Sequence, residues 1–260
     1  MRIARFRVDE TVSFGLVEGD GDDAVVSVLD GHPFGPLRTQ GVALPLASVR
    51  LLAPVLPTKV VGVGRNYAEH AKEMGATELS EEPVLFLKPS TAVVGPDEAI
   101  VLPPGAAEVH HEAELAVVVG GLVPRYLPAE RALDYVLGYT AGNDVSARDK
   151  QRADGQWARA KGYDTFCPLG PWIQTDLDPT DVGVRCLVNG QVRQDGRTAD
   201  MLVGVADLIA FISTVMTLLP GDVILTGTPA GVGPLRAGDL VSVHVDAVGT
   251  LTNRVVARGE

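Results

Sequence analysis

One segment near the middle of the chain, VHHEAELAVVVG at residues 109–120, places two histidines and two carboxylates directly before an apolar run. The run 115–119 is typical of a strand that is buried on both faces. Because side chains alternate along a strand, Glu112 and Glu114 are predicted to project from one face and His111 from the other. Two carboxylates on one face repel each other unless a cation lies between them, and hard ions such as Mg²⁺, Mn²⁺ or Ca²⁺ prefer oxygen ligands.

A third carboxylate is needed to distinguish a metal site from a solvated strand end whose charges lie in water. Asp144 is the best candidate, because its segment GYTAGNDVSARD, residues 138–149, also begins as a strand and ends polar. If Asp144 lies beside the two glutamates, the three carboxylates form a site for one hard divalent cation.

A histidine and a glutamate form a second chemical pair. His70 and Glu73 lie three residues apart in RNYAEHAKEM, residues 65–74, which is predicted to be a helix that ends at Gly75. Residues at this spacing share a helix face. A carboxylate that is hydrogen-bonded to an imidazole fixes its tautomer and makes it a better base. The alternative is an exposed pair on a short surface helix.

Other polar groups follow apolar runs. Lys88 ends the predicted strand 83–90, where a lysine either reaches solvent or faces a cleft. Basic and amide side chains at 146–151 and 157–161 could bind substrate carboxylates or developing oxyanions, or could belong to solvated loops. The loop TGTPAGVG, residues 226–233, lacks the GK[ST] of a P-loop, but its glycines let backbone N–H groups approach a ligand closely.

The composition limits the class of protein. The chain has 260 residues and a formal charge of −11, which argues against nucleic acid or an anionic membrane surface as partner, although a small anionic substrate can still bind locally. Cys167 and Cys186 form no CxxC pair and are interpreted as small buried hydrophobes in a reducing cytoplasm. Neither a membrane span nor a signal-peptide pattern is found in the sequence, so we expect a cytoplasmic protein.

Two domains are predicted, at residues 1–55 and 56–260. Short apolar runs separated by turn clusters over 1–52 indicate a small β-rich module, and the prolines in 53–58 indicate a linker. The later part mixes strands and helices. It is predicted to contain helices at 128–136 and 205–219, a hairpin around Asn189-Gly190, and strands at 223–225, 240–245 and 251–256.

Seven motifs in this order make the chain resemble the fumarylacetoacetate hydrolase family over roughly residues 55–258. They are GRNYAEHAKEMG, PVLFLKPST, VHHEAELAVVVG, LGYTAGNDVSARDKQ, RAKGYDTFCPLGP, LVNGQVRQ and LTGTPAGVGP. The resemblance implies an α+β, mostly β fold, which is a mixed β-sandwich roll with peripheral helices, after a small N-terminal β domain. It also implies a homodimer.

The resemblance assigns roles to particular residues. It implies a metal site for Mg²⁺ or Mn²⁺, with Ca²⁺ as a substitute in crystals, formed by Glu112, Glu114 and Asp144. It also implies an acid–base pair of His70 and Glu73, and a lysine, Lys161, that stabilises negative charge. The substrate-binding residues that it implies are Arg65, Asn66, Lys88, Arg148, Gln151 and Thr228.

The activity implied by the resemblance is hydrolysis of a C–C bond in 3-acylpyruvates, such as acetylpyruvate or fumarylpyruvate, through a metal-bound enolate, as in aromatic catabolism. His70 and Glu73 suit activation of the attacking water. The same residues suit two alternatives, a 2-hydroxyhepta-2,4-diene-1,7-dioate (5-carboxymethyl-2-hydroxymuconate) isomerase and an oxaloacetate decarboxylase. A further alternative is a non-catalytic protein that binds 2-oxo acids.

Overall fold

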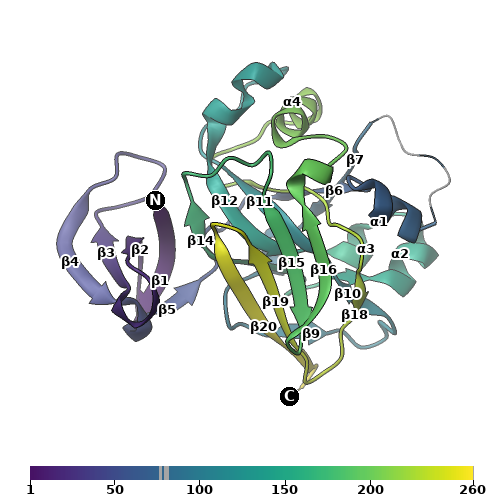
Figure 1. The fold of residues 1–260 in the computed structure, drawn as a ribbon, viewed down its shortest axis with the longest axis horizontal. Coiled ribbons are helices and arrows are strands. Elements are labelled where there is room, and N and C mark those ends of the chain that lie inside the picture. The colour runs from purple at the N-terminus through teal and green to yellow at the C-terminus, as the bar shows by residue number, and fades with distance from the viewer. Residues whose placement is uncertain (76–77, 79–81, 260) are drawn as a thin grey trace.

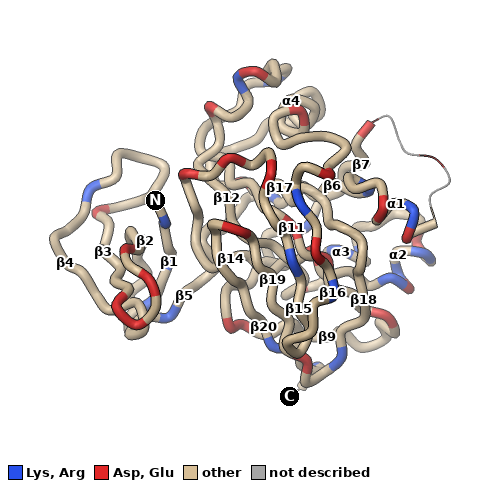
Figure 2. Tube along the Cα trace, in the orientation of Figure 1, with Lys and Arg blue, Asp and Glu red and all other residues tan. Residues whose placement is uncertain are grey.

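β-Strands are the main regular structure of the chain, and the helices lie at its periphery (Figure 1). The computed structural model describes residues 1–75, 78 and 82–259, and within these residues the strands form sheets of twelve, five and three strands. The predicted mostly β fold with peripheral helices is confirmed. The net negative charge is spread over both the N-terminal lobe and the larger part of the molecule (Figure 2).

The twelve-stranded sheet within the described residues runs in the order β4-β3-β2-β1-β14-β12-β11-β17-β6-β7, with β5 paired to β1 and β8 to β14. Its strands are β1 (Arg2–Val8), β2 (Thr11–Glu18), β3 (Val25–Leu29), β4 (Thr39–Pro45), β5 (Arg50–Leu52), β6 (Val60–Gly64), β7 (Val84–Lys88), β8 (Val93–Val94), β11 (Ala113–Val119), β12 (Val136–Asn143), β14 (Cys167–Gln174) and β17 (Val223–Leu225).

The N-terminal strands β1–β5 form a lobe beside the rest of the molecule (Figure 1). This lobe has its own buried cluster, which includes Phe6 and Val26, so the predicted small β-rich module is confirmed. Its first strand also pairs with the larger part, because Ile3 of β1 lies opposite Ile173 of β14. The boundary at residue 55 stays a prediction.

Two smaller sheets complete the strands. The five-stranded sheet has the order β16-β15-β19-β20-β9 and the three-stranded sheet the order β13-β10-β18. The predicted hairpin is present, since Asn189 and Gly190 have φ values of 52° and 77°, as a type I′ turn requires. The strands are β9 (Ile100–Leu102), β10 (Val109–His111), β13 (Ser146–Ala147), β15 (Gly183–Val188), β16 (Gln191–Arg197), β18 (Gly233–Pro234), β19 (Leu240–Val245) and β20 (Gly249–Ala257).

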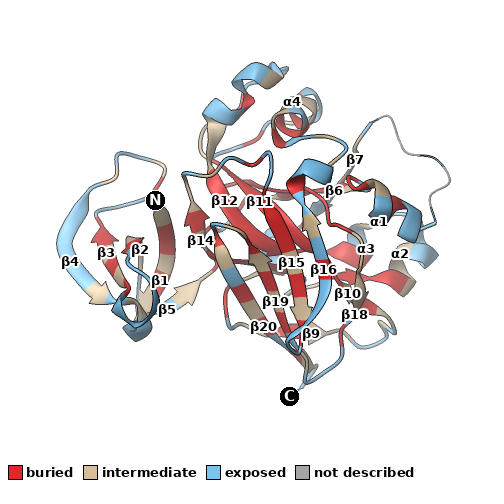
Figure 3. Cartoon of the chain, viewed as in Figure 1, coloured by how far each residue is buried: buried red, intermediate tan, exposed pale blue. Residues whose placement is uncertain are grey.

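The central strand β11 is buried along its whole length, between β12 and β17 (Figure 3). The predicted strand at 115–119 is therefore confirmed and begins two residues earlier, at Ala113. Valine and leucine side chains from both of its faces join two separate hydrophobic clusters, with Val117 in one and Val118 in the other. Because burial of such a side chain contributes about 1.5–3 kcal/mol, this strand is a rigid base for the polar groups that precede it.

The helices are short. They are α1 (Ala68–Glu73), α2 (Arg148–Asp154), α3 (Ala158–Lys161) and α4 (Val205–Val215). The predicted helix at 65–74 begins later, because Arg65 has a φ of 60° and Tyr67 is extended. The predicted helix 205–219 ends early, because the backbone is extended at Met216. The predicted helix 128–136 is a 3₁₀ helix, η4, over Ala129–Tyr135.

None of the helices formed by the described residues is long and apolar enough to cross a membrane.

Candidate active site

The three carboxylates of the sequence analysis lie together at the start of β11. Ala113 pairs with Asn143 of β12, which brings the end of β12 beside Glu112. The backbone reinforces this arrangement, since Asp144 N donates to Glu112 O at 2.9 Å and Glu112 N donates to Asn143 Oδ1 at 3.0 Å. One oxygen each of Glu112, Glu114 and Asp144 lies within 4.8 Å of the others, and all three residues are buried.

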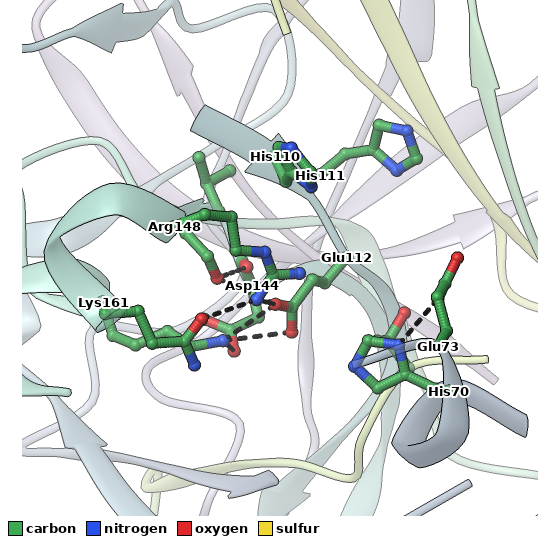
Figure 4. A network of polar contacts seen from close by, with 12 residues as sticks. His70, Glu73, His110, His111, Glu112, Asp144, Arg148 and Lys161 are labelled. Carbon is green, nitrogen blue, oxygen red and sulfur yellow. Dashed lines mark hydrogen bonds and ion pairs between the residues drawn. The ribbon is translucent and has the colours of Figure 1, made fainter. Parts of the chain in front are cut away.

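Three cationic side chains contact the carboxylates, and two of them, Arg148 and Lys161, are seen beside Glu112 and Asp144 in Figure 4. Lys161 Nζ donates to both oxygens of Glu112 at 3.0 Å and also to Asp144 Oδ2. Lys88 Nζ lies 2.6 Å from Asp144 Oδ1, and Arg148 Nη1 lies 2.6 Å from Glu112 Oε1. These cations offset the negative charge of Glu112 and Asp144, which lowers the cost of burying the ionised carboxylates.

The two glutamates of the cluster differ in electrostatic environment. Burial favours the neutral form of Glu112, but the nearby charges of Arg148, Lys161 and His70 outweigh it and hold the pKa of Glu112 well below its usual range. Burial, together with the carboxylates of Asp144 and Glu112, raises the pKa of Glu114 well above its usual range. Glu114 is therefore the carboxylate whose ionised form most needs a further cation.

The donor set fits a divalent metal ion. Three carboxylates supply only oxygen ligands, which Mg²⁺, Mn²⁺ and Ca²⁺ prefer. Glu114 Oε2 accepts a hydrogen bond from Gly227 N at 2.7 Å, which fixes the orientation of the carboxylate. A cation close to Glu114 would compensate the repulsion that raises its pKa.

The acid–base pair of the sequence analysis is formed on α1. His70 is 6% exposed, and its Nδ1 lies 3.1 Å from Glu73 Oε2. A carboxylate can only accept, so Nδ1 carries the proton and Nε2 is left to exchange one. Gly231 N also donates to Glu73 Oε1 at 3.1 Å. Figure 4 shows His70 and Glu73 across from the cluster of Glu112, Asp144, Arg148 and Lys161.

One cavity of about 190 Å³ joins the two groups. Of the predicted site residues, its wall contains Arg65, His70, Glu112, Arg148, Gln151, Lys161 and Thr228. Two predicted substrate contacts are not in that wall. Lys88 lies behind Asp144, and the side chain of Asn66 donates to Thr226 O at 2.8 Å and to Val203 O at 3.0 Å, which fixes the chain around the cavity.

Sequence reasoning missed several groups around Lys161 and Glu112. The Lys161 ammonium lies 4.8 Å from the centre of the Phe86 ring and 6.0 Å from the Trp157 ring, so aromatic faces support it. Gly62 leaves room for Phe86, since a Cβ there would meet the ring at 2.1 Å. Ser146 Oγ donates to Glu112 Oε1 at 2.9 Å. No sequence motif marks these residues. The only hint for Ser146 is that it follows the predicted metal ligand Asp144 by two residues.

The fold is mostly β, and the site combines a buried Glu–Glu–Asp cluster, a buried lysine and a histidine–glutamate pair. Together these features define a class of enzyme, which similarity to known proteins identifies. Residues 59–256 match the model of the fumarylacetoacetate (FAA) hydrolase C-terminal family, and residues 1–54 match the Rv2993c-like N-terminal family. The chain belongs to the fumarylacetoacetate hydrolase family, whose members are enzymes.

Similar proteins cover nearly all of the chain. Protein Rv2993c of Mycobacterium tuberculosis is 52% identical over 266 residues, covering 100% of both chains. Human oxaloacetate tautomerase FAHD2A, mitochondrial, is 45% identical over 233 residues, which are 85% of this chain and 74% of the human protein. A Mycobacterium smegmatis crystal structure described as 5-carboxymethyl-2-hydroxymuconate delta-isomerase is 56% identical, with a TM-score of 0.93, over 99% of this chain and 100% of that one.

Proposed function

We propose that this chain is a divalent-metal-dependent enzyme that moves a proton on carbon 3 of a small 2-oxo dicarboxylic acid. The reaction interconverts keto and enol forms, and oxaloacetate is the best supported substrate. The observation that carries this proposal is that His70, whose Nδ1 is paired with Glu73, lines the same cavity as Glu112, Arg148 and Lys161. The human relative named oxaloacetate tautomerase supports the choice of substrate.

His70 would exchange the proton. With Nδ1 held by Glu73, Nε2 would take the proton from carbon 3 of the keto form, while the electron pair of the C–H bond forms the C2–C3 double bond. The π electrons of the C2=O bond move onto the 2-oxo oxygen, which takes a proton from solvent water and completes the enol, and the proton on Nε2 passes to solvent. In the reverse direction the protonated Nε2 returns its proton to carbon 3. The carboxylate of Glu73 stabilises the positive imidazolium in between.

Cationic side chains would hold the negative charge that develops on the substrate oxygen. Lys161 and Arg148 both line the cavity. The Nε and Nη2 atoms of Arg148 are buried, and no described residue accepts a hydrogen bond from them. The contacts of Nη1 with Glu112 and Gln151 fix the guanidinium, so a substrate oxygen that reaches Nε or Nη2 would meet donors that are already oriented.

Glu112, Glu114 and Asp144 would hold the metal ion, which when bound would act as a Lewis acid toward the 2-oxo group.

Arg65 in the cavity wall favours a second carboxylate on the substrate. Arg65 is exposed, lines the cavity, and has no side-chain hydrogen bond or ion pair to another described residue. Its φ of 60° is a conformation that non-glycine residues rarely adopt, and such positions are concentrated at functional sites. A guanidinium at this place can bind the distal carboxylate of a dicarboxylic acid in a bidentate manner.

The test is an assay of enol and keto oxaloacetate by NMR, with purified protein and with or without added Mg²⁺. We expect Mg²⁺-dependent acceleration of interconversion with no loss of total oxaloacetate. Formation of pyruvate would instead indicate decarboxylation. If the protein accelerates neither reaction under any metal condition, the proposal fails.

Hydrolysis of 3-acylpyruvates is the second candidate, favoured by the same His70–Glu73 pair, because a base in this position can also activate water. Isomerisation of 5-carboxymethyl-2-hydroxymuconate is also a proton transfer between an enol and a carbon conjugated with it. Acetylpyruvate and this dienedioate therefore belong in the same assay, with products identified. Cleavage of acetylpyruvate to acetate and pyruvate at a higher kcat/KM than oxaloacetate interconversion would make the chain a hydrolase.

A further inference from the structure

The side-chain amide of Gln194 is buried, 1% exposed, and makes four hydrogen bonds. Its Oε1 accepts from Ala113 N at 3.0 Å and from His111 Nδ1 at 2.9 Å. Its Nε2 donates to Thr228 Oγ1 and to Pro229 O, both at 2.7 Å. The amide therefore uses both of its donors and both acceptor positions of its oxygen.

These bonds close a ring between three segments that are far apart in the sequence. Ala113 N donates to Gln194, Gln194 donates to Thr228 Oγ1, and Thr228 Oγ1 donates to Ala113 O at 2.8 Å. Ala113 lies between Glu112 and Glu114 in the sequence, and Thr228 lines the cavity. The ring therefore connects the strand that carries two predicted metal ligands to one wall of the cavity.

The loop 226–231, which Gln194 holds at its middle, contacts both halves of the site. At one end Gly227 N donates to Glu114 Oε2 at 2.7 Å. At the other end Gly231 N donates to Glu73 Oε1 at 3.1 Å. A displacement of the loop would therefore move contacts of a predicted metal ligand and of the acid–base pair together.

A purely structural role would be to stabilise the β15–β16 hairpin, but the partners of the amide argue against it. None of the four lies on the hairpin itself: His111 is on β10, Ala113 on β11, and Thr228 and Pro229 are in the loop. The geometry also limits Thr228. Because its hydroxyl proton goes to Ala113 O, that hydroxyl cannot donate to a substrate carboxylate, and its role is to hold the loop.

We propose that Gln194 is a positioning residue that sets the loop 226–231 relative to Glu112 and Glu114, and so controls substrate affinity. Thr228 acts with it as the second member of the ring. The activity and ligand-binding consequences rest on the proposed function, whereas the ordering of the loop does not.

The test compares Gln194→Met with the control Gln191→Met in the full-length protein. Gln191 is an exposed glutamine on the same strand, so the control makes the same chemical change away from the ring.

Two properties are measured: amide hydrogen exchange of residues 226–231, and affinity of the Mg²⁺-loaded protein for oxalate, a planar dianion that resembles a 2-oxo acid enolate. We expect Gln194→Met to speed exchange in this segment and to weaken oxalate binding about tenfold, because four buried partners lose their bonds. The control should change neither.

A double variant of Gln194 and Thr228 distinguishes positioning of the loop from general destabilisation, because residues that act through one ring have non-additive effects on oxalate affinity. We expect Thr228→Val to weaken oxalate binding like Gln194→Met, and the double variant to be no more than about twofold weaker than the worse single variant. Thr228→Ser keeps the hydroxyl and should bind oxalate like wild type. If Gln194→Met does not fold, the comparison of Thr228→Val with Thr228→Ser still tests whether the ring positions the loop.

Two results would overturn the proposal. One is a folded Gln194→Met protein with unchanged exchange at 226–231 and wild-type oxalate affinity. The other is equal affinity in Thr228→Val and Thr228→Ser. If wild type itself binds no oxalate and turns over no 2-oxo acid, the proposed function fails, while hydrogen exchange still decides the role of Gln194.

Discussion

Lys88 Nζ lies 2.6 Å from Asp144 Oδ1, and both side chains are almost completely buried, with exposed fractions of 0% and 1%. Lys161 donates to the other oxygen, Oδ2, so the carboxylate lies between two ammonium groups. Lys88 also lies 3.3 Å from Val145 O. Asp144 is therefore held in one orientation by contacts to both of its oxygens.

Replacement of Lys88 by methionine should destabilise the protein. The change leaves a buried carboxylate without one of its two cations, and such a loss typically costs about 3–5 kcal/mol in the free energy of unfolding. Chemical denaturation in metal-free buffer measures it. The matched control is Lys72→Met, which removes an exposed pair with Glu69 and should change this free energy by less than about 1 kcal/mol. Equal stability of Lys88→Met and wild type would show that the buried pair contributes nothing.

The acid–base role of His70 predicts a graded loss of proton transfer. We expect His70→Asn to lower the rate of deuterium incorporation at carbon 3 of oxaloacetate by about 10²–10⁴-fold, the usual contribution of a positioned general base. Glu73→Gln should lower it less, about tenfold, because the imidazole remains but loses its carboxylate partner. Glu69→Gln is the control on the same helix, since Glu69 is exposed. Wild-type exchange in His70→Asn would assign the proton transfer to another group.

The guanidinium of Arg65, which pairs with no other described side chain, predicts selectivity for dicarboxylates. Arg65→Met should raise KM for oxaloacetate by about 10–100-fold, the range expected from loss of a charge-assisted hydrogen bond, and should leave KM for the monocarboxylate acetylpyruvate nearly unchanged. Steady-state kinetics on both substrates give this ratio. Arg236→Met, which alters an exposed arginine outside the cavity wall, serves as the control. A parallel rise of KM for both substrates would contradict a role for Arg65 at the distal carboxylate.

The raised pKa of Glu114 predicts that metal binding depends on pH. Burial and the neighbouring carboxylates keep a proton on Glu114 at pH values above 4.5, its usual pKa, and this proton must leave when a cation binds. Mg²⁺ affinity should therefore rise with pH until the raised pKa is passed. The stability of the metal-free protein changes in the opposite direction: it falls as pH rises above the usual pKa, because the buried carboxylate is then forced to ionise. Calorimetric titration between about pH 5.5 and 8 checks the first effect, and constant affinity without proton release would contradict it.

The sequence predicted those parts of the site that depend on residues close together in the chain. The apolar run after Glu114 predicted the buried strand, and the spacing of His70 and Glu73 predicted a pair on one helix face, which the structure places 3.1 Å apart. The polar end of the segment 138–149 made Asp144 the candidate third carboxylate, and the resemblance to the family added Lys161, which is 49 residues from Glu112 in the sequence.

Other features depend on tertiary context and have no local signal. The first helix begins at Ala68 rather than at residue 65, because the side chain of Asn66 bonds to Thr226 O and Val203 O, which holds the preceding chain out of a helix. Lys88 was expected to reach solvent or a cleft, but its partner Asp144 is 56 residues away in the sequence. Gln194 ends the motif LVNGQVRQ, but its role depends on Ala113 and Thr228, which are 81 and 34 residues away in the sequence.

The central claim is that Glu112, Glu114 and Asp144 hold a divalent ion on which turnover depends. The most direct measurement is oxaloacetate interconversion by wild type and Glu114→Gln, each first treated with EDTA and then given Mg²⁺. Glutamine keeps the shape of Glu114 and an acceptor for Gly227 N but removes the charge. We expect wild type to lose activity with EDTA and regain it with Mg²⁺, and Glu114→Gln to stay at least about 100-fold less active in both conditions. Full activity of Glu114→Gln in the presence of EDTA would contradict the account.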